Sequence, residues 1–496
     1  MTNFFIVIYI AVLGILSIYG LLGFVTFFLF WHYKNERDLA PVVDLSSLPD
    51  VTVQLPIYNE RFVVERLIES TVSLNYPKDR LQIQVIDDSD DETSEVAATQ
   101  NSHFQAQGFI IEHIRRTNRL GYKAGALAAA LDSAQGEYVA IFDADFQPQS
   151  EFLLDTIPFF IGNPRLGMVQ ARWGHLNASD SPLTAAQSIA LDKHFVMEQN
   201  VRNRANMFPK FNGSAGIWRR TCVEDAGGWR ADTVCEDLCL STRATLKGWE
   251  FRYLADVVAP AELPGGIRAY KNQQARWAKG SIQCLQKYGQ DIIRDANHTL
   301  AGRLYAVLSM SAYGTHILLL LLLILQLPMI LLDISLPPYM VLFTFLGIGQ
   351  PLLFIMAQKE TYPDWRRRIL YFPTLLLVAI GMAPSSTKAM LEAFQTKKHH
   401  PFTRTPKGYS IQSNAFQWQR LYHLPDDGSL WMELILVVYT ACGLALAAFR
   451  GQSGPMFLLF MSLLGFTYVA YLEIRETWNR GTSPTQSNPV ISNKNP

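Results

Sequence analysis

Charged residues are scarce in this chain of 496 residues, of which they make up 17%; soluble proteins usually contain about a quarter. Basic and acidic residues number 43 each, so the formal net charge is zero. A neutral chain without a long basic tract is not expected to bind nucleic acid. Charge gathers between Lys34 and Arg303 and from Lys359 to Asp427, and apolar runs fill most of the rest. This distribution predicts a membrane protein with a water-soluble block.

Cysteine is also scarce, and no Cys-x-x-Cys pair occurs among Cys222, Cys235, Cys239, Cys284 and Cys442. A structural zinc site needs four ligands, and none is spaced near Cys235 and Cys239 to complete one. Reduced cysteines in a cytosolic domain are therefore expected. A glycine-rich Walker loop is missing as well, so phosphates must be held in another way.

The first apolar run, Phe4 to Trp31, lacks the marks of a signal peptide, because no basic residues precede it and no small-residue cleavage site follows. A bilayer span needs roughly 20 apolar residues, which this run supplies. Lys34 and Arg37 follow it and favour the cytoplasmic side. We expect a transmembrane helix over 4–31 and a cytosolic block after it.

Four further apolar runs indicate more spans, and a weaker fifth covers 369–386; the four lie near 311–332, 338–357, 430–449 and 455–474. The basic segments 365–368 and 395–407 both favour the cytoplasm. The weak run between them is then interfacial or re-entrant, which gives five spans, or six if it crosses. We expect transmembrane or re-entrant helices over 304–386, two spans over 430–474 and a disordered cytosolic tail over 475–496.

The soluble block alternates strand-like and helical patterns. Strands are expected at 51–58, 81–88, 109–115 and 137–145, and helices at 62–74 and 123–134. This order implies an α/β domain with a mainly parallel sheet, whose ligands bind at the carboxyl ends of the strands.

Acidic pairs follow these strands. Asp143 and Asp145 share one face of an extended backbone, and two carboxylates beside a diphosphate suit Mg²⁺ or Mn²⁺. A solvated turn is the alternative for this pair and for Asp87 and Asp88. Asp237 begins a helical pattern, where a carboxylate is stabilised as an anion and serves either as a cap or as a general base.

Lys271 to Gly280, KNQQARWAKG, completes a larger pattern at the border of the apolar region. Asp87-Asp88, Asp143-Ala-Asp145, Glu236-Asp237 and Gln273-Gln-Ala-Arg276-Trp277, in this order, resemble the signature of the processive family 2 glycosyltransferases, such as cellulose, hyaluronan and plant mannan synthases. The resemblance covers residues 50–410, and phrases such as VQLPIYNE and GYKAGAL look most like the mannan- and glucan-synthase-like branch.

The resemblance implies a GT-A catalytic domain over 48–262 that binds a UDP- or GDP-sugar, followed by QxxRW and interfacial helices over 263–300. Tyr58 and Lys123 would sandwich the base, and Asp87 or Asp88 would contact the uracil or ribose. Asp143 and Asp145 would bind the diphosphate and an Mg²⁺ or Mn²⁺ ion.

The same resemblance implies an inverting reaction that forms β-glycosidic bonds. Asp237, beside Glu236, would act as the general base on the acceptor hydroxyl. Arg276 would stabilise the leaving diphosphate, while Gln273 and Trp277 would contact sugar. Asn212, Gly213 and Ser214 would form the rest of the acceptor site.

Two later segments are also expected to serve the site. Phe402, Thr405 and Lys407 in the cytosolic segment 387–428 match a family gating loop, with Arg404 in place of its valine; a basic segment touching lipid headgroups is the alternative. The apolar face formed by Ile282, Leu285, Ile292 and Ile293 predicts an interfacial amphipathic helix that docks the catalytic mouth on the bilayer.

Two functions remain open at this stage. One is a polysaccharide synthase that extends a β-glycan and threads it through its spans, which the number of spans and the gating-like loop favour. The other is a non-processive glycolipid synthase that adds one sugar to a lipid such as diacylglycerol or ceramide, because no large cytosolic regulatory domain is present. A non-enzymatic channel or scaffold would not need these acidic residues together with Arg276. The acceptor is thus a glycan or a lipid, and the sugar, the linkage and the oligomeric state stay open.

Overall fold

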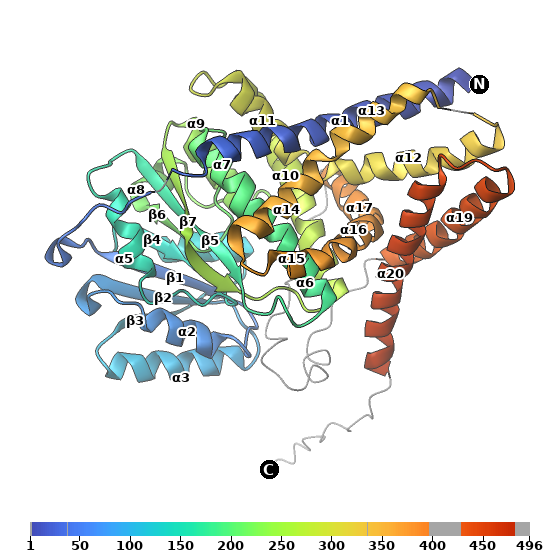
Figure 1. Cartoon of the computed structure of the whole chain (residues 1–496). Coiled ribbons are helices and arrows are strands. Elements are labelled where there is room, and N and C mark those ends of the chain that lie inside the picture. The colour runs from blue at the N-terminus through green and yellow to red at the C-terminus, as the bar shows by residue number, and fades with distance from the viewer. Residues whose placement is uncertain (1, 37, 335, 396–427, 482–496) are drawn as a thin grey trace, which may run out of the picture.

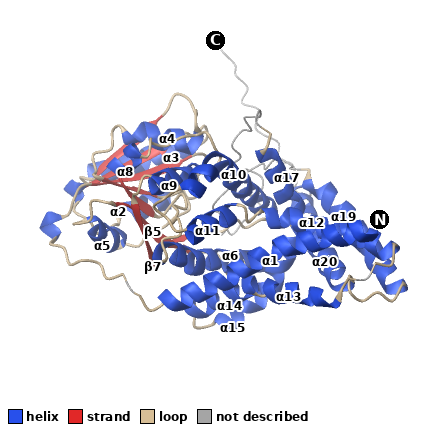
Figure 2. Cartoon of the chain, turned by 90° about the horizontal axis from the view of Figure 1, so that it is seen from above, coloured by secondary structure: helices blue, strands red, loops and turns tan. Residues whose placement is uncertain are grey.

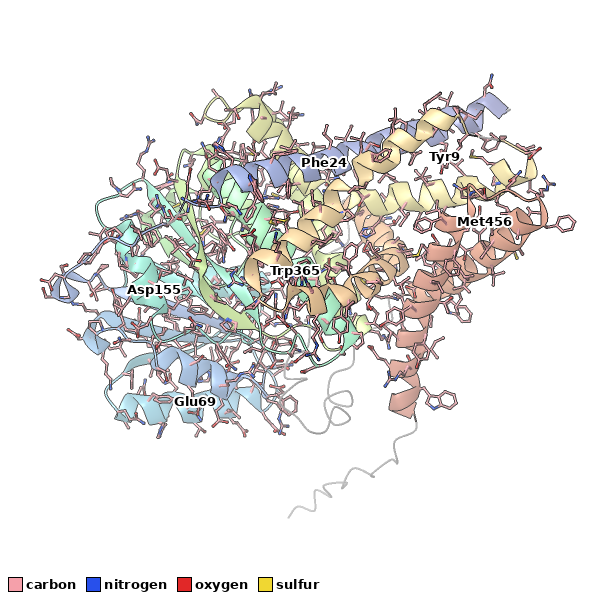
Figure 3. The ribbon with its side chains drawn as sticks, in the orientation of Figure 1. Tyr9, Phe24, Glu69, Asp155, Trp365 and Met456 are labelled. Atoms are coloured by element: carbon pink, nitrogen blue, oxygen red, sulfur yellow. The ribbon has the colours of Figure 1, made fainter. Side chains whose placement is uncertain are left out.

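The computed structural model describes residues 2–36, 38–334, 336–395 and 428–481. A domain built around a β-sheet lies beside a bundle of long helices (Figure 1). Glu69 and Asp155 belong to the sheet domain, whereas Tyr9 and Met456 lie at the far end of the bundle (Figure 3). The predicted combination of an α/β domain and an all-α region is therefore confirmed.

Seven strands form one sheet in the order β3-β2-β1-β4-β6-β5-β7. The strands are β1 (Val51–Ile57), β2 (Leu81–Asp87), β3 (Ile110–Arg115), β4 (Tyr138–Ile141), β5 (Leu166–His175), β6 (Gly216–Arg219) and β7 (Glu250–Ala261). Only β6 runs antiparallel to its neighbours β4 and β5. The carboxyl ends of the other strands consequently meet at one edge of the sheet.

Helices cover both faces of this sheet. Tyr138, Ala140 and Phe142 of the β4 region pack into one apolar cluster, and the alternate residues Val139 and Ile141 pack into another. Side chains alternate between the two faces of a strand, so both faces are buried. The helices are α2 (Val64–Val72), α3 (Thr93–Ala106), α4 (Tyr122–Leu131), α5 (Phe152–Thr156), α6 (Pro182–Asp192), the π-helical segment η4 (Lys193–Gln199), α7 (Asn200–Arg204), α8 (Arg220–Asp225) and α9 (Glu236–Leu246). Short 3₁₀ turns are η1 (Leu45–Ser47), η2 (Lys78–Arg80) and η3 (Ile157–Phe160), with η5 (Pro338–Met340) and η6 (Ile369–Tyr371) later in the chain.

Four helices among the described residues are long and apolar enough to cross a bilayer, and they identify a multi-pass membrane protein. They are α1 (Thr2–Tyr33), α12 (Gly314–Leu331), α19 (Ser429–Phe449) and α20 (Met456–Gly481). A fifth span is possible by length if α16 (Phe372–Gly381) and α17 (Ala383–Ala393) are counted as one, although the chain bends there by 46°. Pro384 removes a backbone donor near this bend. By its bend, this pair is either a broken span or a re-entrant loop; the interfacial or re-entrant segment expected over 369–386 stays a prediction.

The predicted span 338–357 is not one continuous helix. It divides at Ile348 into α13 (Val341–Gly347) and α14 (Gly349–Thr361), with α15 (Trp365–Arg368) following. Pro351 lacks the N–H that would bond to the carbonyl of Gly347, which explains the interruption. A Cβ on Gly20 of α1 would lie 2.2 Å from the carbonyl oxygen of Leu346. Glycine at this position allows α1 to pack closely against α13, and Gly23 does the same for α14.

The helix α10 (Ile267–Arg294) lies between the sheet domain and the bundle in both views (Figure 1 and Figure 2) and is followed by α11 (Leu300–Met310). Its predicted membrane-facing stripe is largely covered by protein: Ile282 packs beside Ala389 of α17, and Ile292 packs beside Ala306 of α11. Ile293, by contrast, is 55% exposed. The stripe thus mainly joins helices to one another. The predicted tail also begins too early, because α20 continues to Gly481.

Candidate active site

A cavity of about 870 Å³ lies at the carboxyl ends of the strands, where they face α9, α10 and α17. Its walls contain every predicted site residue of the described ranges except Asp87 and Ser214. These residues are Tyr58, Asp88, Lys123, Asp143, Asp145, Asn212, Gly213, Glu236, Asp237, Gln273, Arg276 and Trp277. Segments more than 200 positions apart in the chain therefore contribute to one site. Phe402, Thr405 and Lys407 lie outside the described residues.

The adjacent carboxylates of Asp87 and Asp88 have different surroundings. Asp87 is buried, with one carboxylate oxygen accepting a hydrogen bond from Ser94 Oγ at 2.6 Å and lying 2.9 Å from His113 Nε2. Burial raises the pKa of Asp87, but hydrogen bonds from His113, Ser89 and Ser94 outweigh this effect and lower the pKa to about 2. Asp88 instead lines the cavity and is held by Arg116, whose Nε donates at 2.8 Å. Of this pair, Asp88 is therefore the one placed to meet a ligand.

Tyr58 meets an arginine that the sequence patterns did not single out. The guanidinium of Arg119 lies 3.1 Å from the centre of the Tyr58 ring, and both side chains line the cavity. A guanidinium over an aromatic face is a favourable contact. Lys123, the predicted partner of Tyr58 across the base, contacts the carboxylate of Asp143 and the carbonyl oxygen of Gly213.

Lys123 and the loop before β6 organise the Asp143 side of the cavity. Lys123 pairs with the Asp143 carboxylate and donates to the carbonyl oxygen of Gly213 at 2.8 Å. Burial lowers the pKa of Lys123, but the carboxylates of Asp143 and Glu236 more than offset this, so its pKa is raised. Ser214 Oγ accepts from the backbone N–H of Asp143 at 2.9 Å. Ser214 does not line the cavity but thus positions the backbone of Asp143, which does.

Asp237 lies in the first turn of α9, as its pattern predicts. Its pKa is raised to about 7, first by burial and then by the charge of Glu236, against the opposing effects of the Leu238 N–H, Lys123 and Arg276. A carboxyl that exchanges its proton near neutral pH suits general-base work. Gly213 has φ +87° and approaches closely: a Cβ there would lie 3.0 Å from Asp237 Oδ2. A larger residue at 213 would displace this carboxylate.

Asn212 is held in the cavity wall by side chains of the π-helical segment η4. Gln199 Nε2 donates to Asn212 Oδ1, and Asn212 Nδ2 lies 2.9 Å from His194 Nε2. π-helical turns are frequent at functional sites. The sequence contains no periodic signal for this segment, so His194 and Gln199 were not expected here.

The helix α10 divides its side chains between two environments. Asn272, Gln273, Arg276 and Trp277 line the cavity. Gln274 points elsewhere, and its Oε1 accepts from the hydroxyl of Tyr313 at 2.8 Å. With 3.6 residues per turn, one helix can present one set to a ligand and another to the bundle.

The second half of the bent pair also reaches the site. Ala389, Glu392 and Ala393 of α17 line the cavity, and Glu392 Oε2 lies 3.7 Å from Lys279 Nζ of α10. The strand end of β5 adds Trp173 and His175. Apolar patterning marks α17 only as a membrane-border segment, so its place at the site depends on tertiary packing.

A divalent ion fits this wall only together with a phosphate ligand. No cluster of three or more histidine, cysteine, aspartate or glutamate side chains suited to a metal occurs among the described residues. Asp143 and Asp145 nevertheless both line the cavity. Mg²⁺ and Mn²⁺ accept one or two carboxylates and complete their coordination with phosphate and water oxygens.

Comparison with known proteins places this site in context. Residues 49–280 match the family model described as glycosyltransferase like family 2. The chain is 40% identical over 291 residues to glucomannan 4-beta-mannosyltransferase 2 of Arabidopsis thaliana, which covers 57% of this chain and 54% of that protein. It is 39% identical over 345 residues to glucomannan 4-beta-mannosyltransferase 7 of the same plant, covering 68% and 57%. The chain thus spans about half the length of the curated relatives it matches.

The fold also resembles that of a solved structure. A mannosyltransferase from Pyrobaculum calidifontis, in complex with GDP-Man and Mn²⁺, superposes with a TM-score of 0.56 and 22% identity. The match covers 79% of this chain and the whole of that one. At this identity the likeness concerns the fold alone.

Proposed function

Residues 49–280 belong to the family 2 glycosyltransferases, and from this premise we propose that the protein is an inverting membrane glycosyltransferase that transfers sugar from a nucleoside-diphosphate donor. One observation carries the proposal: Asp88, Asp143, Asp237, Arg276 and Trp277 line a single cavity at the strand ends. That combination offers a base, cationic support for a leaving group and a surface for sugar stacking.

Asp237 is the base in this proposal. Its carboxylate takes the proton of an acceptor hydroxyl while the acceptor oxygen bonds to the anomeric carbon of the donor. The bond between that carbon and the phosphate oxygen breaks, and the nucleoside diphosphate leaves with the electron pair. Attack opposite the leaving group inverts the anomeric centre, so an α-linked donor gives a β-glycoside.

The donor spans the strand-end wall. Tyr58, Asp88 and Arg119 line the part of the cavity where the nucleoside would bind, and Lys123 and Arg276 would stabilise charge on the diphosphate. Asp143 and Asp145 would hold an Mg²⁺ or Mn²⁺ ion, which supplies further stabilisation of the leaving diphosphate when it is bound. Asn212, Gly213 and Trp277 face the acceptor.

The relatives suggest a mannan-type polysaccharide as the product, because their names describe 4-beta-mannosyl transfer to glucomannan. The catalytic domain would face the cytosol, as the basic residues flanking α1 and α14 favour. The helices of the bundle would then receive the growing glycan.

Purified full-length protein incubated with GDP-mannose or UDP-sugars, Mg²⁺ or Mn²⁺, and membrane lipid tests this proposal. We expect long β-linked mannan from GDP-mannose and loss of turnover in excess chelator. A product of one sugar on a lipid would instead identify a glycolipid synthase. No transfer from any of these donors would contradict the proposal.

Asp237→Asn and Asp132→Asn make a matched pair for the same assay. Both remove one carboxylate, but Asp132 is exposed and lies outside the cavity. We expect transfer to be lost only in Asp237→Asn, while GDP binding survives in both. Equal activity in the two variants would rule out Asp237 as the base.

A further inference from the structure

We propose that Lys271, Glu433 and Glu473 are positioning residues for sugar transfer, through which the membrane hairpin of α19 and α20 sets the placement of Arg276 and Trp277. This inference rests on the proposed function. The hairpin is then part of the catalytic apparatus in addition to being a membrane anchor.

The three side chains form a buried ion cluster between α10 and the hairpin. Lys271 Nζ pairs with the carboxylates of Glu433 on α19 and Glu473 on α20, and donates to Ser429 Oγ at 3.1 Å. Their side chains are 2%, 0% and 3% exposed, respectively. Arg268 of α10 adds a fourth charge, with its Nε 3.7 Å from Glu473 Oε1. Lys271 therefore joins α10 to both helices of the hairpin, and Arg268, about one turn earlier, adds a contact with α20.

A second contact holds the beginning of α10. The residue before it, Gly266, has no side chain to cap the free N–H groups of the first turn. Glu476 of α20 accepts from the N–H of Ile267 and, at 3.4 Å, from that of Arg268. A carboxylate at a helix N-terminus is also favoured by the helix dipole. The hairpin thereby restrains α10 along its axis as well as around it.

Helix geometry connects these contacts to the cavity. With 3.6 residues per turn, Lys271 and Arg276 lie roughly 140° apart around α10. Lys271 faces the hairpin, and Arg276 and Trp277 line the cavity. Because the helix is a rigid rod at this length, rotation or sliding at Lys271 moves Arg276 and Trp277 relative to Asp237.

Buried charges suit such a role better than apolar residues would. The cost of removing ions from water offsets much of their attraction, so a buried pair is weak evidence for stability. Leaving one of the charges unpaired is strongly unfavourable, however. Alternative placements of α10 against the hairpin would separate these charges, whereas a purely apolar contact could slide.

Steady-state kinetics of full-length Lys271→Met and Lys271→Arg in lipid nanodiscs tests the proposal, with GDP and UDP binding measured alongside. A displacement of about 1 Å at a reacting group can cost about 10²-fold in rate. We expect a loss of about that size in kcat for Lys271→Met, with nucleotide affinity unchanged because the strand-end wall is intact. Lys271→Arg keeps the charge and should recover most of the rate.

Lys247→Met provides the control, since it removes a lysine whose partner, Asp225, is on the surface. We expect it to match the wild type. If Lys271→Met does not give monodisperse protein, Glu433→Gln and Glu473→Gln decide the question, because each leaves Lys271 one carboxylate. Wild-type kcat in the folded triad variants, or equal losses of kcat and nucleotide binding, would overturn the positioning role. A wild-type protein without transfer would contradict the proposed function instead, and would be recognised before any variant is compared.

Discussion

The two sides of the cavity are held in place in different ways. On the strand side, carboxylates are fixed locally: Ser214 holds the backbone of Asp143, and Arg116 holds Asp88. On the helical side, Arg276 and Trp277 belong to α10, whose restraints include Glu433 and Glu473 in the hairpin. The strand side is thus part of the sheet domain, while the placement of the helical side depends on how that domain packs against the membrane helices.

The largest effect should come from the group that stands where the two sides meet. Asp237→Asn removes the proposed base but keeps the shape of the side chain, and general-base catalysis typically contributes about 10²- to 10⁴-fold. We expect kcat to fall within that range while the KM for donor changes little. A rise in the KM for donor as large as the fall in kcat would show that Asp237 contributes to donor binding. Single-turnover rates with saturating donor measure the difference.

A smaller loss should follow from moving that carboxylate instead of removing it. Gly213→Ala must adopt φ near +87° and brings a methyl group 3.0 Å from Asp237 Oδ2. We expect kcat to fall by about 10- to 10²-fold, as for other displaced catalytic groups. Gly162→Ala is a suitable control, because it has φ +79° but open space around its Cβ position. Similar losses in both variants would show that backbone strain, not displacement, is responsible.

On the strand side, Asp87 and Asp88 are expected to have different roles, Asp87 in stability and Asp88 in donor binding. Because the folded pKa of Asp87 is about 2, below the unfolded value of 3.8, its ionised form stabilises the protein above pH 4. That contribution, roughly 2 kcal/mol, is lost as the pH falls from about 4 to 2. We expect Asp87→Asn to lower the free energy of unfolding by a comparable amount at pH 7, with little change in kcat per folded molecule. Chemical denaturation of the wild type and of Asp87→Asn measures the change in the free energy of unfolding.

Asp88→Asn should show the opposite behaviour. Its carboxylate lines the cavity, so we expect a raised KM for donor and a small change in stability. Tight donor binding in Asp88→Asn, together with weak binding in Asp87→Asn, would reverse the assignment of the two residues.

The smallest effect concerns the pH at which Asp237 becomes active. Its pKa of about 7 predicts that kcat/KM rises with pH and is half-maximal near pH 7. The charge of Glu236 contributes to this elevated pKa, so Glu236→Gln should move the midpoint to lower pH. A midpoint that stays in place would show that burial alone sets the value.

Much of the fold was predictable because its signals are local. The expected strands at 51–58, 81–88, 109–115 and 137–145 correspond to β1, β2, β3 and β4, since an apolar or alternating pattern in a short segment is a local signal. Apolar length also identified the membrane helices. The prediction of one continuous helix over 338–357 was wrong, because apolar length does not reveal the backbone hydrogen bond that Pro351 removes.

The site was predictable only in part. Motif order indicated Asp143, Asp237 and Arg276, but it could not separate Asp87 from Asp88, because neighbouring residues on a strand end differ only in the direction they face. Arg119 and His194 carry no periodic or motif signal. Arg119 lines the cavity, and His194 in the π-helical segment contacts Asn212, and both placements depend on folding.

The order of residues alone settled the chemistry available to this protein: acidic pairs after strands, a glutamine-arginine-tryptophan helix, and apolar runs long enough for a bilayer. Those are properties of short segments, in which periodicity and composition act directly. The meeting of these segments in one cavity, and the burial of Lys271 between Glu433 and Glu473, were decided by folding. Burial and Coulomb interactions depend on distances between residues far apart in the chain, so they come into being only when the sheet and the hairpin close around α10.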